Sequence, residues 1–365
     1  MRLQRQKQIV RLKSSKVMWI IQVTFPLLVV NCNEIVCSRM NRIVWIDIAK
    51  AVCIILVVIG HYYPDIHPAW YEDMRNVIYS FHMPLFIFVS GFVYNATKKD
   101  ITYGDFVWKK VKRLMVPYLT VSVLVITLKL FTQGQAYMEN PVTALSYVKM
   151  FYRPEAGYFL WFIWALWWMF VCIPFFKTPN SRLGLLIFSV FLPMVSPYLP
   201  DEFCLKEFSR MLQFFVAGVV AYDWRQYLLW AKHIPVFVVA LFFCLIEVLQ
   251  YVWGNCSFIA AYVGIAFVLK LSCCIEEKVK ANNTWGKFVM LLSAASYIIY
   301  LLHTTFEGFV KAIVFKLPYL SDLSNDIMFT IGAIMVIFTG VMIPVLLYKY
   351  VLRRYLVTKV LFGLK

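Results

Sequence analysis

Charged residues are scarce in this chain: they make up 15% of its 365 residues, whereas hydrophobic residues make up 62%. This composition excludes an ordinary soluble domain, which carries far more charge for its length. The apolar residues come in long runs from residue 43 to the C-terminus, and a helix needs about 20 such residues to cross a bilayer. The runs are too long and unbroken for the strands of a barrel. We therefore predict an all-α, polytopic transmembrane helical bundle surrounded by membrane lipids.

Paired cysteines and a soluble module are also lacking. The nine cysteines include no Cys-x-x-Cys spacing. Five of them lie within or at the ends of apolar runs: Cys53, Cys172, Cys244, Cys273 and Cys274. We interpret them as small apolar side chains without a redox or metal role. The formal net charge is +17, but the basic residues lie in short loops between apolar runs, so no nucleic-acid partner is predicted.

About ten transmembrane helices are predicted. They lie near residues 43–62, 77–95, 114–132, 158–176, 183–199, 205–222, 234–253, 256–275, 288–306 and 328–348. Cytoplasmic loops are enriched in Lys and Arg, and one set of alternate loops and ends holds 20 of these residues while the other set holds 7. Both the N-terminus and the C-terminus of the bundle are therefore predicted to be cytoplasmic.

Residues 1–40 are a separate N-terminal extension. Its apolar segment, Val17 to Val30, is short for a span, and a cleaved signal conflicts with a first helix that starts inside. Because Met40 directly precedes the first span, we interpret residues 1–40 as an over-extended gene start. An extra interfacial or spanning helix remains the alternative. Residues 41–350 form the predicted membrane domain, and residues 351–365 a basic cytoplasmic tail.

The first span contains three ionisable residues, which are costly inside a membrane and are therefore functional candidates. Asp47 and Lys50 are three residues apart and share a helix face. His61 returns to nearly the same face about 16 Å further along. A structural salt bridge with an interfacial histidine explains this helix equally well.

Two further histidines are predicted to reach the same depth. His82 lies in the outer third of the second span, two residues before Pro84, whose ring and missing N–H free nearby backbone groups. His303 lies at the outer end of the ninth span. With His61, three histidines on three helices converge on the outer half of the membrane. His67 and His233 lie in loops and carry no comparable signal.

Imidazole chemistry favours acid–base catalysis over metal binding. The chain has no Glu-x-x-His or His-x-x-x-His pair with these histidines, so no metal site is predicted. A neutral imidazole can take the proton of a hydroxyl, and a nearby cation can stabilise the oxyanion of an attacked thioester. We therefore assign His61 or His82 as the general base, with Lys50 as the electrostatic partner held by Asp47.

The predicted loop from Lys98 to Arg113 is strongly basic. Its Lys and Arg side chains match the phosphates of a donor such as coenzyme A. We assign four of them to donor binding: Lys109, Lys110, Lys112 and Arg113. Positive-inside topology with lipid-phosphate contact explains the same residues more simply.

Several segments resemble the membrane-bound acyltransferase family 3, which includes bacterial O-acetyltransferases of surface polysaccharides. They are Ile46 to Ala51, Val57 to His61, Ser80 to Gly91, Arg113 with Pro117-Tyr118, Leu160 to Phe162, and Ser296 to His303. The resemblance covers roughly residues 41–350. In these segments we assign Ser90, Trp161, Tyr297 and His303 to substrate binding, although Trp161 is also typical of an interfacial belt.

The resemblance implies acyl transfer from cytoplasmic acyl-CoA, usually acetyl-CoA, to a hydroxyl of a cell-surface polysaccharide or lipid-linked glycan. It implies a multi-pass protein of the bacterial inner membrane with no bound cofactor. In the family the first helix typically has an Arg, ten intervening residues and then a His. Lys50 keeps this spacing and charge but lacks the bidentate fork of an Arg side chain. The form with Lys at this position is similar to the fucose 4-O-acetylase branch of the family.

A transporter or flippase of a glycan or related solute is the alternative function. It also needs buried charges that face a cavity, but the sequence lacks the two related halves common in transporters. For the enzyme, the donor lies inside while the histidines lie near the outer face. A pantetheine arm would therefore reach them through a polar channel with Lys50 and Asp47 midway.

Overall fold

The computed structural model describes residues 43–133, 141–227, 233–254, 257–280, 283–314 and 325–364. The chain divides into two compact units, Met1–Val44 and Trp45–Lys365, and nearly all of the described residues belong to the second. The predicted N-terminal extension, residues 1–40, lies outside the described residues. The described part contains helices and no strand, which confirms the prediction of an all-α helical bundle.

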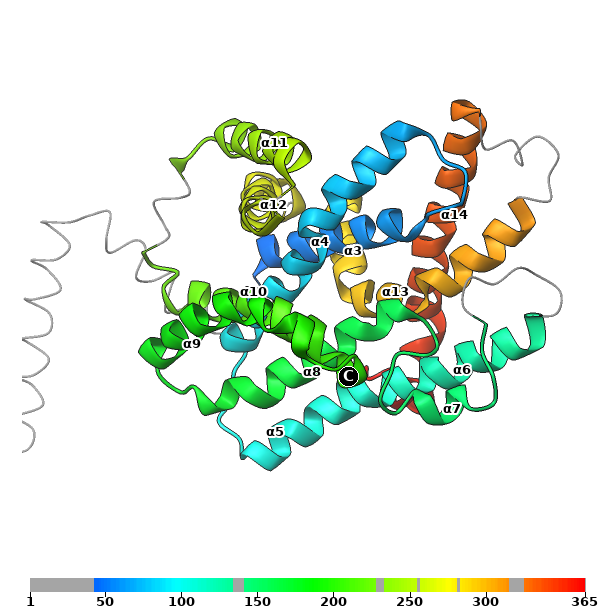
Figure 1. Cartoon of the computed structure of the whole chain (residues 1–365), viewed down its shortest axis with the longest axis horizontal. Coiled ribbons are helices and arrows are strands. Elements are labelled where there is room, and N and C mark those ends of the chain that lie inside the picture. The colour runs from blue at the N-terminus through cyan, green and yellow to red at the C-terminus, as the bar shows by residue number, and fades with distance from the viewer. Residues whose placement is uncertain are drawn as a thin grey trace, which may run out of the picture. The chain divides into compact units, whose positions relative to one another are not determined.

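Figure 1 shows how the helices are arranged. The α-helices are α3 Val44–His61, α4 Ala69–Ala96, α5 Tyr103–Lys110, α6 Val116–Thr132, α7 Ser146–Lys149, α8 Trp161–Cys172, α9 Pro179–Phe191, α10 Leu205–Asp223, α11 Val236–Trp253, α12 Ser257–Lys280, α13 Thr284–Val314, α14 Asp326–Leu347 and α15 Leu356–Leu361. Two π-helical turns, Val111–Met115 and Tyr348–Leu352, follow α5 and α14.

Eight helical segments within the described ranges are long and apolar enough to cross a membrane, so the chain is an integral membrane protein. The spans predicted at 183–199 and 205–222 are not among these eight segments. The span predicted at 183–199 starts inside α9, which begins at Pro179 and ends at Phe191. Short 3-10 turns at Pro193 and Pro197 take the place of its second half. Helix α10 matches its predicted bounds, but its first turns carry Lys206, Glu207 and Arg210.

Two predicted loops are largely helical. Helix α4 begins at Ala69, eight residues before the predicted span, because its polar first turns hide the helix from an apolar window. Residues 103–132 form one helical segment through α5, a π-helical turn and α6, so most of the loop predicted at 98–113 is wrong. The basic side chains assigned to donor binding therefore lie on a helical extension of a span.

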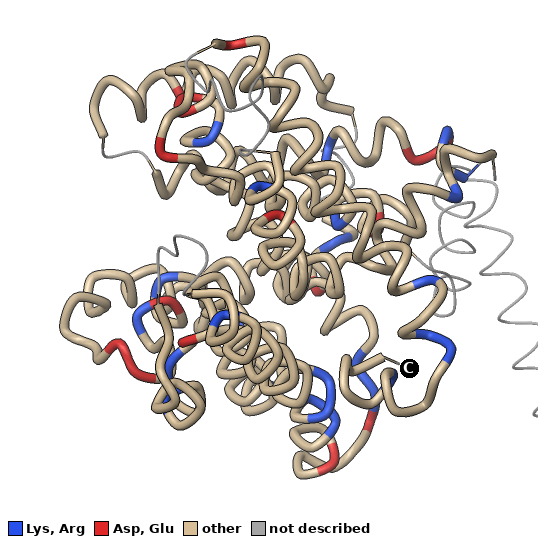
Figure 2. Tube along the Cα trace, turned by 90° about the vertical axis from the view of Figure 1, so that its right-hand side faces the viewer, with Lys and Arg blue, Asp and Glu red and all other residues tan. Residues whose placement is uncertain are grey.

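The interior of the bundle is built from α3, α4 and α13. In their apolar windows, 56%, 61% and 61% of the residues are buried, against 11% in α11. Helix α4 packs against α10 and α12, α13 packs against α14, and α11 covers α12 (Figure 1). Charged residues lie mostly at helix ends and connections (Figure 2).

Glycines allow α4 and α10 to approach closely. A Cβ atom on Gly91 would lie 2.0 Å from the carbonyl oxygen of Phe215, and one on Gly218 would lie 2.0 Å from that of Phe88. Small residues at such contacts are typical of helix packing in membranes. Gly91, in one of the segments that resemble the family, is therefore needed for packing.

Candidate active site

Three histidines from three helices meet beside Tyr79. The rings of His61, at the end of α3, and His303, in α13, are stacked with their centroids 4.9 Å apart. The Tyr79 hydroxyl lies 3.1 Å from Nδ1 of His61, and the Tyr79 ring centroid lies 4.8 Å from that of His82. We call His61, His82 and His303 the histidine cluster. The predicted convergence is therefore present.

Backbone hydrogen bonds fix the tautomers of two of these rings. Nδ1 of His82 lies 2.8 Å from the Ile78 carbonyl oxygen. Nδ1 of His303 lies 3.0 Å and 2.8 Å from the carbonyl oxygens of Ile299 and Tyr300. A carbonyl oxygen only accepts, so each Nδ1 donates its proton. In the neutral ring Nε2 then carries the lone pair, which is the form that a general base needs.

The Nε2 atoms of both rings are buried and find no hydrogen-bond partner among the described residues. A buried polar atom without a partner costs free energy, and native structures rarely keep one without a reason. Two such atoms beside a third imidazole fit a site that receives the hydroxyl or carbonyl groups of a substrate.

Gly60 and Phe159 shape the histidine cluster. A Cβ atom on Gly60 would lie 2.8 Å from Cε2 of Tyr79, so the glycine leaves room for the ring that contacts His61. On another side, the Phe159 ring centroid lies 5.5 Å from that of His303. The Tyr300 hydroxyl donates to the Phe159 carbonyl oxygen and holds this segment against α13.

The predicted ion pair forms further along α3. Nζ of Lys50 lies 2.8 Å from Oδ1 of Asp47, and the Ser293 hydroxyl donates to the same oxygen at 2.6 Å. Asp47 contacts α13 through Ser293, and His61 contacts it through His303, so α3 and α13 run side by side in the same direction. Lys50 and His61 are separated by about 16 Å along α3. The ion pair therefore lies apart from the histidine cluster.

The predicted donor-binding residues are mostly exposed. Lys109, Lys112 and Arg113 are exposed, whereas Lys110 is half-buried with Nζ 3.2 Å from the centroid of the Phe170 ring. This cation–π contact gives Lys110 a structural role beside any role in donor binding. The structure does not bring these residues into contact with the histidine cluster.

Of the residues assigned to substrate binding, only His303 belongs to the histidine cluster. The Ser90 hydroxyl donates to the Phe86 carbonyl oxygen of its own helix at 2.8 Å. The Trp161 ring packs edge-on against Phe162, with centroids 6.3 Å apart. The buried Tyr297 hydroxyl has no hydrogen-bond partner in the described part of the chain.

Comparison with known sequences identifies the family. The sequence profile of the acyltransferase domain matches residues 43–349, which is most of the chain. The chain belongs to the acyltransferase domain family. This match confirms the resemblance drawn from the N-terminal motifs.

Two curated relatives are nodulation proteins NolL. That of Mesorhizobium japonicum is 32% identical over 156 residues, which are 41% of this chain and 39% of the relative. That of Sinorhizobium fredii is 31% identical over 145 residues, 38% of each chain. The match therefore spans about two fifths of these relatives. No solved structure gives a significant match.

The sequence did not point to Arg75, Tyr79 or Glu307. Arg75, Tyr79 and His82 share one face of α4 by their helical spacing, but the predicted span began too late to include Arg75. Glu307 follows His303 by one turn of α13 and is buried, and Oε1 has no hydrogen-bond partner among the described residues. The spacing of four residues between His303 and Glu307 was the feature of the sequence that could have pointed to Glu307.

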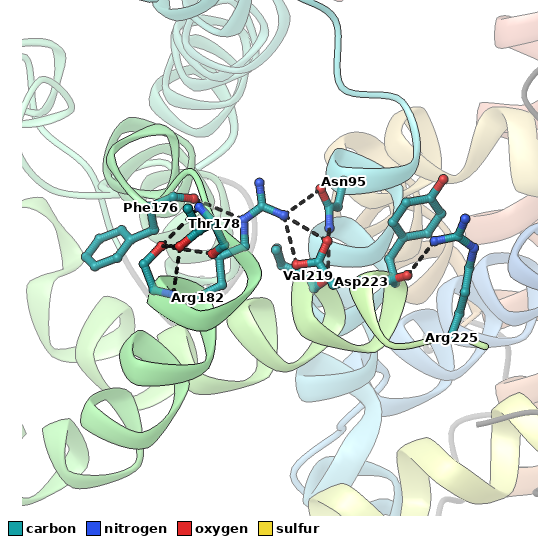
Figure 3. A network of polar contacts seen from close by, with 9 residues as sticks. Asn95, Phe176, Thr178, Arg182, Val219, Asp223 and Arg225 are labelled. Carbon is teal, nitrogen blue, oxygen red and sulfur yellow. Dashed lines mark hydrogen bonds and ion pairs between the residues drawn. The ribbon is translucent and has the colours of Figure 1, made fainter. Parts of the chain in front are cut away.

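A second buried polar group lies at the other end of α4 (Figure 3). The Arg182 guanidinium of α9 donates to both carboxylate oxygens of Asp223 at 2.9 and 2.8 Å, and to the Asn95 side-chain oxygen at 3.1 Å. The Asn95 amide donates to Asp223 at 2.7 Å and to the Val219 carbonyl oxygen at 3.0 Å. We call Arg182, Asp223 and Asn95 the arginine network. It joins α4, α9 and α10.

Proposed function

We propose that this chain is an integral-membrane O-acyltransferase of the bacterial inner membrane. It moves an acyl group, acetyl in the first place, from acyl-CoA to a sugar hydroxyl of a cell-surface polysaccharide or lipid-linked glycan. Membership in the acyltransferase domain family supports the reaction class. The observation that carries the proposal is the histidine cluster with its two unpartnered Nε2 atoms.

In this reaction the imidazole of His61 or His82 takes the proton of the acceptor hydroxyl. The oxygen attacks the thioester carbonyl carbon, the C–O bond forms, and the C–S bond breaks. The departing thiolate then takes the proton from the imidazolium, so charge and protons balance. Lys50, held by Asp47, contributes positive charge further along α3.

The donor is proposed to approach from the basic segment. Lys109, Lys112 and Arg113 offer exposed positive charge for the coenzyme A phosphates. Tyr297 on α13 has a buried hydroxyl without a hydrogen-bond partner among the described residues. Tyr297 lies six residues before His303, about 9 Å along the helix. A pantetheine arm is long and thin enough to follow such a route between helices.

The test uses membranes with labelled acetyl-CoA and glycan acceptor. Label should enter the glycan with the wild-type chain, and His61→Ala should lower the rate of transfer by about 10²- to 10⁴-fold. His233→Ala, which changes an exposed histidine away from the cluster, serves as the matched control. Movement of unlabelled glycan across the membrane without label transfer would support the transporter alternative. Full transfer by His61→Ala would overturn the assignment of His61 as base.

A further inference from the structure

Arg75 lies next to the histidine cluster in an aromatic setting. Its guanidinium carbon lies 3.9 Å from the centroid of the Tyr63 ring and 4.3 Å from that of Tyr79. Its Nε–H donates to the Gly60 carbonyl oxygen at 3.1 Å. Gly60 directly precedes His61, and Tyr79 contacts the His61 ring. The guanidinium is therefore held in one orientation beside the proposed reaction centre.

No carboxylate of the described residues forms an ion pair with Arg75. Glu72, one turn earlier on α4, instead bonds to Nε2 of His67 at 2.9 Å. A side-chain hydrogen bond also joins Arg75 to Tyr79. The guanidinium carries four terminal N–H groups, so the remaining ones can meet a ligand. These nitrogens form the planar fork that matches the two oxygens of a carboxylate or phosphate.

Arg75 lies at the surface of the described bundle. The side chains of Tyr63 and Tyr79 are 37% and 39% exposed, and Arg75 itself is half-buried. An arginine that only anchors the protein to lipid extends its head toward the headgroups. Arg75 instead turns its Nε–H to the Gly60 carbonyl oxygen inside the bundle. This orientation favours a ligand that also reaches the histidine cluster.

We propose that Arg75 binds an anionic group, a carboxylate or a phosphate, on the acceptor glycan. This contact would hold the acceptor hydroxyl against the histidine cluster and would make the enzyme select acidic or phosphate-linked acceptors. The inference rests on the proposed function for the identity of the ligand as an acceptor, but the anion site itself stands on the geometry of Arg75.

Binding is measured with the full chain in phosphatidylcholine nanodiscs. The probes are a uronic acid oligosaccharide, a neutral oligosaccharide of the same length, and a polyprenyl-phosphate-linked sugar. Arg75→Gln should weaken binding of the anionic probes by about 10- to 100-fold, because charge-assisted hydrogen bonds are lost. Binding of the neutral probe should stay within about twofold. The two anionic arms show whether a carboxylate or a phosphate is preferred.

Two further variants control for folding and for charge alone. Arg225→Gln removes an arginine that also stacks on a tyrosine and donates to a backbone carbonyl, with its guanidinium carbon 4.2 Å from the Tyr222 ring centroid. It should leave binding unchanged. Arg75→Lys keeps the charge without the fork and should lose part of the affinity.

Equal weakening of neutral and anionic probes by Arg75→Gln, or no weakening at all, would overturn the proposal. His61→Ala should retain the binding. If anionic probes bind through Arg75 but no acyl transfer is found with any acceptor, the proposed enzyme fails while the anion site stands. If transfer occurs and Arg75→Gln changes kcat for all acceptors without changing KM, the anion site fails instead.

Discussion

The histidine cluster and the arginine network are both polar groups built around α4, yet they differ in how their atoms are paired. In the arginine network the Arg182 guanidinium, the Asp223 carboxylate and the Asn95 amide satisfy one another. In the histidine cluster, Nε2 of His82 and Nε2 of His303 have no partner among the described residues.

We interpret this difference as one between a structural group and the proposed functional one. Buried charges that are fully hydrogen-bonded can hold helices together without any ligand. A buried ring nitrogen with a lone pair and no partner lowers stability and is retained where a substrate supplies the missing contact. Removing a residue from the network should therefore reduce stability, whereas removing one from the cluster should reduce activity.

The largest expected effect is on catalysis. Replacing His61 with Ala should lower the rate of acyl transfer by about 10²- to 10⁴-fold, the usual contribution of a general base. The melting temperature should change little, because His61 is half-buried at the end of α3. Initial rates with labelled acetyl-CoA and thermal unfolding in detergent measure the two effects. A large loss of stability would place His61 among the structural residues.

The next effect is on stability. Arg182→Met leaves the Asp223 side chain, which is 13% exposed, without its cation and should destabilise the fold by about 3–5 kcal/mol. The double variant Arg182→Met with Asp223→Leu should recover part of this loss, since it removes both charges. Denaturant unfolding in micelles measures the change. If the double variant is no more stable than the single one, the network is not held by the pairing described here.

A smaller effect is expected from the contact that positions Tyr79. Gly60→Ala places a Cβ atom where it would lie 2.8 Å from Cε2 of Tyr79, so the ring must move away from His61. We expect a loss of about tenfold in kcat and about 1–3 kcal/mol in stability from the strain. Gly308→Ala is the matched control, because a Cβ atom there meets nothing within 4 Å. Equal rates for the two variants would contradict this role of Gly60.

The smallest effects are expected on the basic segment. Lys109→Gln should raise KM for acyl-CoA about twofold to fivefold with unchanged stability, as an exposed charge does. Lys110→Gln should in addition lower stability by about 0.5–1 kcal/mol, because Nζ lies over the Phe170 ring. Donor titrations and thermal unfolding measure both. An unchanged KM in both variants would leave this segment with a topological role alone.

The apolar runs predicted the helical membrane fold because lipid leaves few other choices to a backbone. This prediction failed where polar residues are helical and where an apolar stretch does not form one long helix. The first turns of α4 are polar but helical, and the proline-rich stretch after Phe191 is apolar but broken into short turns. The loop between the spans predicted at 158–176 and 183–199 included Arg182, whereas the structure buries this side chain in α9.

For the site, the cost of charge in a membrane pointed to Asp47, Lys50 and His61, and helix direction placed three histidines at one depth. The sequence did not predict which atoms remain unpaired, because pairing depends on partners from other helices. Tyr79 and Arg75 were missed for the same reason: their contacts to His61 and Gly60 cross between α4 and α3. The basic segment was predicted as a loop but is largely helical, and its role in donor binding stays a prediction.

We propose that the histidine cluster is the reaction centre and that the arginine network is structural. The most direct test measures acyl transfer per folded molecule in nanodiscs for His61→Ala, His82→Ala, His303→Ala and Arg182→Met side by side. We predict that each histidine variant loses most of its turnover, while Arg182→Met loses stability but keeps near wild-type turnover in the folded fraction. Histidine variants with full turnover, or an inactive but fully folded Arg182→Met, would contradict the account.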